Sequence, residues 1–316
     1  MILREAIERH VLWRRAHGAK FTSGANLLRR FLDHADGDAP CDAVTRGQVL
    51  AYLAGDGRPT RHRENRHYAL AGFWRHAISR GHAVRSPMPV DAPRSAVRTP
   101  PYIYSRDELA RLLNPITVEA SRRGAVQLDV VTFRTLLLLL YGAGLRFGEA
   151  TRLTLTDVDL ANAVLTIRAT KFYKSRLVPV SSQLAALLHS HVSLRQRAGL
   201  VNGRDALLLA NRDGTRLASS TVQAAFDMLR RIAGVHRAAV GRTIPRLHDL
   251  RHSFAVHRLT SWYRQGADVQ RLLPVLSTYL GHADLEDTKV YLSMTPELLK
   301  EASLRFAGYA AGGRHA

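Results

Sequence analysis

Four segments within residues 1–85 repeat apolar residues every three or four positions, a pattern typical of amphipathic helices. Their apolar positions are Leu3, Ile7, Val11 and Leu12; Leu27, Leu28, Phe31 and Leu32; Val49, Leu50, Tyr52 and Leu53; and Tyr68, Phe73, Trp74 and Ile78. Thr45 and Gln48 form a capping box before the third segment, and glycines within residues 55–57 separate it from the fourth. The pattern predicts an N-terminal four-helix bundle.

A proline-rich stretch follows the predicted bundle. Residues 86–104 contain five prolines, which favours an extended connection between domains. Ser105 and Glu108 then form a second capping box, which is a signal for a new helix. We therefore expect an N-terminal domain over 1–85, a linker over 86–104 and a second domain over 105–316.

The second domain is predicted to be mainly helical with one pair of strands. Residues 129–141 are predicted to form a buried helix that contains the longest apolar run, Leu136–Leu140, and ends at glycine. Residues 164–168 and 177–180 alternate apolar and polar positions as strands do, and a basic turn joins them. Helical patterns fill most of the chain after this turn. The expected fold class is mainly α with a small β-sheet in the C-terminal domain (α+β).

Charge narrows the class of partner. The 316 residues carry 46 Lys and Arg against 26 Asp and Glu, a formal net charge of +20. Such a surplus indicates a polyanionic partner, with nucleic acid first and an anionic membrane surface second. No apolar run approaches the about 20 residues that span a bilayer, and no signal pattern opens the chain, so we expect a cytoplasmic protein. The single cysteine, Cys41, excludes a disulfide framework and a cysteine-based zinc site.

Lysine is rare in this basic chain. Only five of the 46 basic residues are lysines. Lysine can release a proton near neutral pH when its surroundings lower its pKa, whereas arginine cannot. Two of the five, Lys171 and Lys174, lie in the basic turn between the predicted strands, which makes this turn a candidate for proton chemistry.

Five segments of the second domain carry candidate chemistry. They are GLRFGEA at 144–150, ATKFYKSRLVPV at 169–180, HDLRHSFA at 248–255, YLGH at 279–282 and TKVYLSMTPELL at 288–299. In this order, with Arg146 25 residues before Lys171 and His282 nine residues before Tyr291, they resemble the tyrosine recombinases, the phage-integrase and Xer-like family. The arginine-rich helical first domain and the proline-rich linker also match the layout of that family.

The resemblance implies a site-specific recombinase or integrase that cleaves and rejoins DNA through a 3′-phosphotyrosyl intermediate, for a mobile element or for chromosome or plasmid resolution. It implies a SAM-like N-terminal bundle that binds the core DNA site, followed by a catalytic domain. The expected partners are double-stranded DNA and three further copies of the chain, giving a homotetramer on DNA and a monomer or dimer when free. No metal, other cofactor or ATP is expected, and the setting is nucleoid-associated and prokaryotic in type.

The resemblance also assigns roles to single residues. Tyr291 matches the nucleophile. Arg146 and Arg251 match two arginines that bind the non-bridging phosphate oxygens, for which a planar guanidinium provides two-pronged contact. Lys171 matches the group that protonates the leaving 5′ oxygen.

Three further positions support the predicted site. His248 shares a helix face with Arg251 and matches a residue that assists proton removal from the tyrosine or positions the phosphate. His282 matches a second group that hydrogen-bonds the phosphate. Glu149 matches a supporting acidic position, with an ordinary intrahelical ion pair as the alternative.

Other candidate residues have weaker support. His76, His252 and His257 lie outside the matching positions and are expected to be core or surface histidines. Tyr173 and Tyr279 lie outside the segment that matches the nucleophile, and Lys174 is expected to contact phosphate or solvent. Arginines in and before the fourth predicted helix are candidate DNA contacts, with a solvated face as the alternative. These are Arg58, Arg61, Arg63, Arg66 and Arg75.

Three other functional classes compete with the recombinase. HDLRH places two histidines four residues apart, but it lacks the glutamate and the third ligand of a metallohydrolase. A non-catalytic DNA-binding protein could keep the fold, but the joint presence of Tyr291, the two arginines and Lys171 argues against it. A type IB topoisomerase would share the chemistry, but the helical first domain and the short chain favour the recombinase.

The segment after Tyr291 is expected to form a C-terminal docking helix over 296–306. Its apolar residues at helical spacing are Leu298, Leu299, Ala302 and Phe306. A helix this short is marginal alone, so its apolar face must be buried. It packs either on its own domain or, as the resemblance implies, on a neighbouring subunit of the tetramer.

Overall fold

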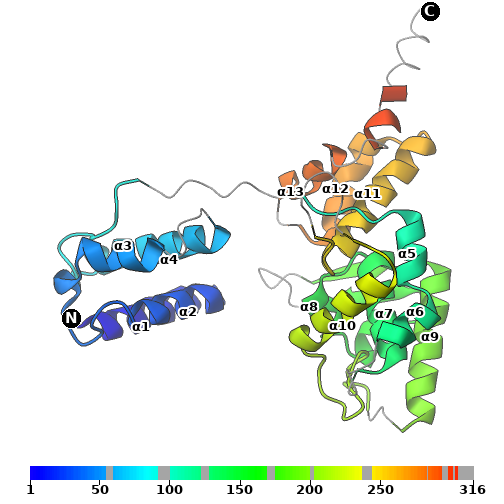
Figure 1. Cartoon of the computed structure of the whole chain (residues 1–316), viewed down its shortest axis with the longest axis horizontal. Coiled ribbons are helices and arrows are strands. Elements are labelled where there is room, and N and C mark those ends of the chain that lie inside the picture. Colours follow the sequence, from blue (N-terminus) through cyan, green and yellow to red (C-terminus); the bar gives the residue numbers. More distant parts are fainter. Residues whose placement is uncertain are drawn as a thin grey trace, which may run out of the picture. The chain divides into compact units, whose positions relative to one another are not determined.

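The computed structural model describes residues 1–54, 60–91, 100–121, 128–168, 175–199, 203–236, 244–282, 284–293, 298–301 and 303–304. The chain divides into two compact units, Met1–Arg98 and Thr99–Ala316 (Figure 1). Helices dominate both units, and a small antiparallel sheet lies in the second. The predicted fold class, mainly α with a small C-terminal sheet, is confirmed.

The first unit is built from α1 (Leu3–Ala16), α2 (Thr22–Phe31), α3 (Arg46–Ala54) and α4 (Arg61–Ser79), with a short 3-10 helix, η1 (Cys41–Ala43), before α3. α1 packs on α2 and α4, and both α2 and α3 pack on α4. Aromatic side chains such as Phe31, Phe73 and Trp74 fill the shared core. The predicted capping box is present, since the N–H of Gln48 donates to Oγ1 of Thr45 at 3.2 Å.

The buried face of α4 differs from the predicted one. Phe73 and Trp74 are buried as expected, but Tyr68 exposes 62% of its surface and Ile78 39%. Leu70 and Ala77 occupy the core instead. The buried positions 70, 73, 74 and 77 follow the 3.6-residue period, and Tyr68 and Ile78 lie just outside this stripe. Leu12 of α1 is similarly exposed, at 63%.

The second unit contains most of the helices. They are α5 (Arg106–Leu112), α6 (Pro115–Ser121), α7 (Val130–Gly142), α8 (Phe147–Ala150), α9 (Ser182–Arg197), α10 (Ser219–Ile232), α11 (Asp249–Arg264), α12 (Val269–Leu280) and α13 (Glu286–Lys289), with the 3-10 helices η2 (Leu155–Asp157) and η4 (Val290–Ser293). The capping box predicted at Ser105 and Glu108 opens α5. Within the described ranges, no helix is long and apolar enough to cross a bilayer.

The start of the second unit corrects the predicted linker. Tyr104 was placed in the linker range 86–104 by the sequence, yet its ring is fully buried. Its N–H donates to Oγ of Ser253 at 2.8 Å, and its hydroxyl donates to the carbonyl of Arg246 at 2.9 Å. The aromatic ring thus anchors the strand-like approach to α5 in the core, and the end of the predicted linker belongs to the second unit.

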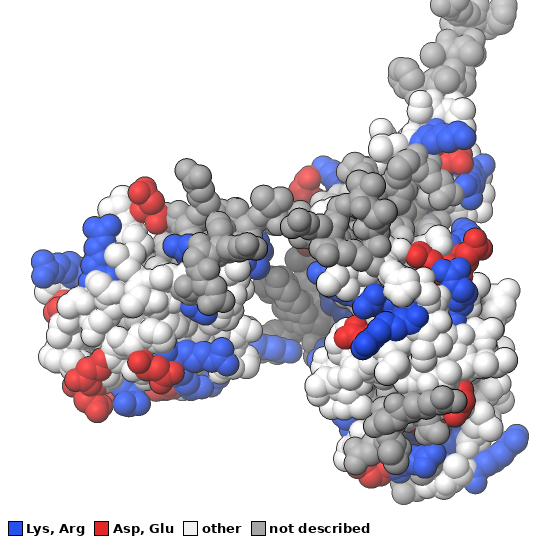
Figure 2. Space-filling view, in the orientation of Figure 1, with Lys and Arg blue, Asp and Glu red and all other residues white. Residues whose placement is uncertain are grey.

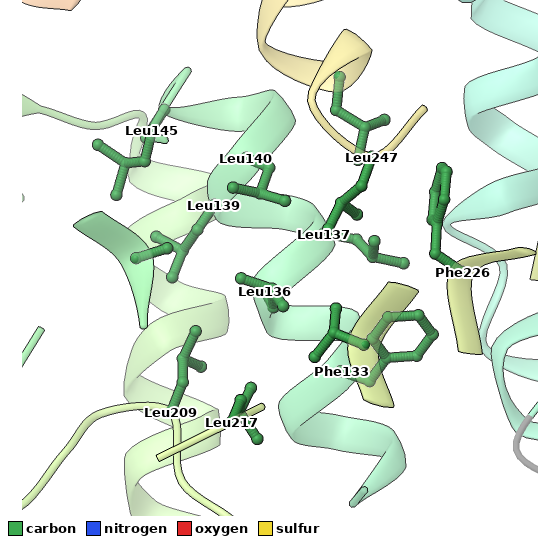
Figure 3. Close-up of a cluster of buried hydrophobic side chains, with 14 of the residues drawn as sticks. Phe133, Leu136, Leu137, Leu139, Leu140, Leu145, Leu209, Leu217, Phe226 and Leu247 are labelled. Atoms are coloured by element: carbon green, nitrogen blue, oxygen red, sulfur yellow. The ribbon is translucent and has the colours of Figure 1, made fainter. Parts of the chain in front are cut away.

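α7 forms the centre of the core of the second unit. Four of its leucines, Leu136, Leu137, Leu139 and Leu140, are buried, which requires other elements around most of the helix. α6, α8, α9 and α11 pack against it. Figure 3 shows the side chains of α7 meeting leucines and a phenylalanine from several surrounding segments. The labelled residues are Phe133, Leu136, Leu137, Leu139, Leu140, Leu145, Leu209, Leu217, Phe226 and Leu247.

The sheet has the order β1 (Val158–Asp159), β2 (Val164–Ile167), β3 (Arg176–Pro179), with antiparallel neighbours. β2 and β3 are the predicted pair, in the register Leu165 opposite Val178. β1 is too short to show an alternating pattern in the sequence. β3 packs on α12, and α12 packs on α11, so the sheet is linked to the helix that contains the HDLRHSFA segment and to the helix after it.

Candidate active site

Glu149 lies at the centre of a cluster of arginines. It sits in the first turn of α8 and its carboxylate is buried. Arg176 of β3 binds both carboxylate oxygens, with Nη1 3.0 Å from Oε1 and Nη2 2.9 Å from Oε2. Burial by itself would raise the pKa of Glu149, but the hydrogen bonds from Arg176 and from the backbone of Arg146 hold it at about 2. The carboxylate is therefore ionised at neutral pH.

Arg251 is held by backbone carbonyls in the interior. Its side chain is 2% exposed, and its Nη1 and Nη2 donate to the carbonyls of Gly144 and Leu280, both at 2.6 Å. Nη1 also lies 3.8 Å from Oε2 of Glu149. Burial, together with the nearby charge of Arg146, lowers the pKa of Arg251 to about 9, so the guanidinium still carries its charge at neutral pH.

Arg146 occupies the same cluster but reaches solvent. Its Nη1 donates to Oε1 of Glu149 at 2.9 Å, and its Nη2 donates to the carbonyl of Gly281 at 3.0 Å. About a third of the side chain, 35%, is exposed. The ion pair that was the alternative for Glu149 is present, and it coexists with the clustering of Arg146 and Arg251 around residues 280–281.

Two glycines make this arrangement possible. Gly144 has φ +59°, and a Cβ there would lie 2.5 Å from a ring carbon of Phe254. Gly281 ends α12 with φ +68°, and a Cβ there would lie 2.6 Å from Nη1 of Arg176. Only glycine adopts these conformations without strain while leaving room for the neighbouring side chain.

Tyr291 lies beside His252 and His282. Its Oη is 2.9 Å from Nδ1 of His252, and its ring stacks with that of His282 at 6.1 Å between centroids. The tyrosine is 2% exposed, in η4, and packs in the apolar cluster of α11 and α12. Burial raises the pKa of Tyr291, and the charges of Arg251 and Arg146 offset part of that rise. The hydroxyl is therefore protonated at neutral pH.

Three histidines of the cluster are neutral at pH 7. Burial, followed by nearby positive charges and histidines, lowers the pKa of His252 to about 3 and that of His282 to about 4. Burial and Arg251 also lower the pKa of His248. The ring centroids of His248 and His252 lie 4.8 Å apart, so His252 lies beside His248 as well as in contact with the tyrosine hydroxyl. Nδ1 of His282 lies 2.6 Å from Oγ1 of Thr288, which orients the imidazole.

The structure thus brings together Arg146, Glu149, His248, Arg251, His282 and Tyr291. Lys171 and Lys174 lie outside the described residues, as does Tyr173. Tyr279 packs as expected, with its ring stacked on Phe254 and its hydroxyl donating to the carbonyl of Pro179.

The HDLRH segment is bound into the fold rather than open to a metal. Asp249 is fully buried and accepts hydrogen bonds from the N–H and Nη2 of Arg246. In the described part of the chain, no three His, Cys, Asp or Glu side chains are placed to hold a metal ion. The metallohydrolase alternative therefore gains no third ligand from these residues.

Two residues of the cluster were missed by the sequence. His252 was expected to be an ordinary core or surface histidine, but it touches the hydroxyl of Tyr291. Arg176 lies in the ATKFYKSRLVPV segment, directly before the predicted strand at 177–180, and had no predicted role. The signal for His252 is its place directly after Arg251, and the signal for Arg176 is a charged residue that begins the otherwise apolar RLVPV strand.

The candidate DNA-contacting arginines of the first unit differ in exposure. Figure 2 shows basic side chains spread over the visible face of each unit, with acidic ones among them. Arg75 is exposed, and Arg61 is exposed beside Glu64 at 3.3 Å. Arg66 is half-buried, where it donates to the carbonyl of Tyr52 at 2.8 Å and lies over its ring. Arg63 is also half-buried, and Arg58 lies outside the described residues.

An exposed face of α4 contains two of these arginines. Its exposed or partly exposed positions at helical spacing are Arg61, Asn65, Tyr68, Gly72 and Arg75. A Cβ at Gly72 would meet nothing within 4 Å. Glycine inside a helix costs about 1 kcal/mol relative to alanine, and no neighbour among the described residues of the first unit requires it here.

Comparison with known proteins places the chain among DNA-recombining enzymes. Residues 106–297 match the Phage integrase family model. The tyrosine recombinase XerD of Bifidobacterium longum is 30% identical over 83% of this chain and 82% of that protein. XerA of Thermococcus kodakarensis is 30% identical over 87% and 84%. A Sinorhizobium fredii protein, y4rE, provisionally named an integrase/recombinase, is 38% identical over 96% of this chain and 95% of its own length.

Solved structures share the fold. A lambda integrase dimer bound to a COC′ core site aligns with a TM-score of 0.63 and 19% identity, covering 94% of this chain and 97% of that one. The Tn1549 transposon integrase in complex with a circular intermediate DNA aligns with a TM-score of 0.66 and 17% identity, covering 97% and 99%.

Proposed function

The chain belongs to the phage integrase family and is a tyrosine-type site-specific recombinase, and we propose that it cuts and rejoins DNA through a 3′-phosphotyrosyl bond to Tyr291. The observation that carries the proposal is the convergence of a tyrosine, two arginines and three histidines around residues 280–282. Arg146 and Arg251 both bind this backbone, and His282 follows it directly.

In the proposed step, Oη of Tyr291 attacks the phosphorus of a DNA strand. An oxygen–phosphorus bond forms to the tyrosine, and the bond from phosphorus to the 5′ oxygen breaks. The His252–His248 pair accepts the tyrosine proton, and Lys171 donates a proton to the leaving oxygen. Because the phosphotyrosine keeps the energy of the broken bond, the reverse attack by a 5′ hydroxyl rejoins the strand without ATP.

Arg146 and Arg251 are proposed to bind the non-bridging oxygens of the phosphate. Negative charge on these oxygens grows in the transition state, so fixed guanidinium groups stabilise it more than the ground state. His282 adds a hydrogen bond to the same group. We expect this chemistry to need no metal and no other cofactor.

The first unit is proposed to bind double-stranded DNA through the exposed face of α4. Arg61 and Arg75 supply charge for phosphates, and Asn65 and Tyr68 between them supply polar and aromatic contacts. Gly72 would let the duplex approach the helix backbone. The related recombinases and the DNA-bound integrase structures support DNA as the partner, for a mobile element or for chromosome or plasmid resolution.

The central test is capture of the covalent intermediate. Wild-type protein incubated with nicked DNA taken from either side of its own gene should form a covalent adduct at the 3′ phosphate. Tyr291→Phe should bind this DNA with unchanged affinity and form no adduct, because only the nucleophilic oxygen is removed. Denaturing gel electrophoresis and peptide mapping measure both results.

Tyr279→Phe is the matched control for this test. It removes a hydroxyl from a tyrosine twelve residues earlier, which bonds only the carbonyl of Pro179 among its described contacts. This variant should still form the adduct. Adduct formation by Tyr291→Phe would contradict the proposal and point to Tyr279 or Tyr173.

We further propose that the recombinase acts as a homotetramer linked by its C-terminal segment. Leu298 is fully buried in its own unit, and Glu301 pairs with Arg264 at 3.0 Å, whereas Leu299 and Leu304 are half exposed. The buried leucine anchors the segment in its own unit, and the exposed leucines can contact a neighbouring copy of the chain.

Removing residues 302–316 tests this linkage while keeping Leu298 and Glu301 in place. Binding to a single DNA site and thermal stability should stay near wild type, and the yield of paired-site complexes in native gels should fall at least about tenfold, the effect of losing about 1.4 kcal/mol of association energy. Normal pairing by the truncated chain would contradict the docking role.

A further inference from the structure

Arg176 is the main partner of the buried carboxylate in the active site. It binds both oxygens of Glu149 in the two-pronged geometry that gives the strongest arginine–carboxylate pairs. Its Nε also donates to the carbonyl of Tyr279 at 2.8 Å. Nine-tenths of the Arg176 side chain is buried, so water does not screen this pair as it would on the surface.

Three guanidinium groups surround a single carboxylate at this place. Arg146 donates to Glu149 through its backbone N–H and through Nη1, and Arg251 lies 3.8 Å away. With Arg176 present, one positive charge balances the carboxylate, and two positive charges remain. Without Arg176, the same carboxylate would be balanced only by Arg146 and Arg251, the residues assigned to the DNA phosphate.

We infer that Arg176 is a positioning residue for strand cleavage, which neutralises Glu149 so that Arg146 and Arg251 stay available to the phosphate. This inference rests on the proposed function and adds a residue to it. Arg176 does not need to touch the DNA for this role, because it acts through Glu149.

The backbone around Arg176 fits the same role. Gly281 approaches the guanidinium so closely that a Cβ would lie 2.6 Å from Nη1. The carbonyl of Gly281 accepts from Arg146, and the carbonyl of Tyr279 accepts from Arg176. The end of α12 therefore lies between the neutralising arginine and the phosphate-binding one, and holds both in fixed positions before His282.

A purely structural role for Arg176 makes different predictions. If the residue only fastened β3 to α12, its loss would lower stability and activity whatever the charge at position 149. If it neutralises Glu149, removing the carboxylate should make Arg176 dispensable. The two roles are therefore separated by a double-mutant cycle between positions 149 and 176.

The experiment measures single-turnover formation of the Tyr291 adduct by wild type, R176Q, E149Q and E149Q/R176Q, with DNA saturating and far below each melting temperature. R176Q should be slower by about 100-fold, the usual cost of misplacing groups that contact the transition state. E149Q/R176Q should recover at least about tenfold over R176Q and match E149Q within about threefold, as expected for residues that act as a unit.

The pH profile gives a second readout that a structural role would not move. In R176Q the buried carboxylate loses its main partner, so its pKa rises and it takes up a proton as the pH falls. Protonation ends its competition for Arg146 and Arg251, so the deficit of R176Q relative to wild type should shrink from pH 8 to pH 6. The deficit of E149Q/R176Q should not change over this range.

Two further variants serve as controls. R176K keeps the charge but loses the two-pronged contact, and should lie between wild type and R176Q. R195Q removes another buried arginine of the same unit, one that donates to the carbonyl of Ala210, and should lower the melting temperature without a pH-dependent cleavage deficit.

The outcomes separate this inference from the proposed function. Recovery in the double variant together with the pH effect supports the inference. A wild-type adduct with no recovery in E149Q/R176Q overturns the inference alone, and absence of any wild-type adduct overturns the proposed function and the inference with it. If R176Q does not fold, the comparison of E149Q/R176Q with E149Q decides: equal rates support the inference, and a further tenfold loss overturns it.

Discussion

The arginines of α4 and the arginines around Glu149 differ in their exposure to solvent and in the number of their fixed hydrogen-bond partners. On α4, Arg61 and Arg75 are exposed, and Arg61 pairs with the buried carboxylate of Glu64. In the second unit, Arg251 and Arg176 are buried, and each guanidinium has at least two fixed acceptors. Arg146 lies between these extremes, with one side bound and one side exposed.

This difference in exposure distinguishes two contributions of an arginine, its charge and its fixed position. An exposed arginine attracts phosphate from any direction, and salt weakens that attraction because counterions compete for it. A buried arginine has already lost its water and its side-chain freedom during folding, so it binds an oxygen at one fixed position without further cost. The first setting suits affinity for DNA, and the second suits the rate of a reaction on one phosphate.

The largest effect should come from changing geometry while keeping charge. Arg251→Lys should reduce the rate of adduct formation by about a thousandfold, because a lysine cannot reach both carbonyl acceptors and still face a phosphate. Arg146→Lys should cost less, about a hundredfold, since this side chain is less constrained. Single-turnover cleavage assays measure both rates. Minor losses in both variants would show that only charge matters at these positions.

A smaller effect is expected on the exposed side of the comparison. Arg75→Ala should weaken DNA binding severalfold and reduce the slope of log affinity against log salt by about one, as for a single phosphate contact. Arg66→Ala, the matched variant on the same helix, should instead lower thermal stability, because Arg66 holds the carbonyl of Tyr52. Binding titrations between 50 and 200 mM salt, typical of such work, would distinguish them. A reversed pattern would assign the DNA contact to Arg66.

The smallest effect concerns the pH dependence of stability. His252 and His282 have pKa values lowered to about 3 and 4 by burial, whereas in the unfolded chain they titrate near 6.5. The unfolded state therefore gains protons first as the pH falls, and stability is lost below pH 6.5, by up to about 1.4 kcal/mol per pH unit for each histidine. Urea unfolding at pH 7 and pH 5.5 measures this loss. His252→Asn should make it shallower, and an unchanged slope would contradict the assignment.

The sequence singled out residues that the structure brings together. Arg146, Arg251, His282 and Tyr291 are far apart in the chain, and the sequence could mark them because each proposed role demands one residue type. Arg176 and His252 could not be identified in this way. Their importance depends on which neighbour each side chain meets, Glu149 in one case and the hydroxyl of Tyr291 in the other, and this is settled by packing of β3, α11 and η4.

Local sequence signals predicted the helices of the first unit but not every buried face. The helices of the first unit follow from apolar spacing and capping residues, which are local signals. The buried face of α4 was misjudged at Tyr68 and Ile78, because large apolar residues were taken as core although the stripe that contacts α2 runs beside them. Tyr104 falls in the predicted linker because the prolines before it favour an extended connection. The sequence pattern gives no sign that this single side chain is buried in the second unit.

The burial of Tyr291 has a kinetic consequence. With 2% of the residue exposed and its oxygen against His252, no phosphodiester can reach the oxygen in the arrangement described. In the proposed reaction, strand cleavage therefore requires η4 to open first, and the frequency of that opening sets an upper limit on turnover that no improvement in the chemical step can exceed. A net charge of +20 favours nonspecific encounters with DNA, so in the proposed reaction the same limit sets how rarely such an encounter ends in a broken strand.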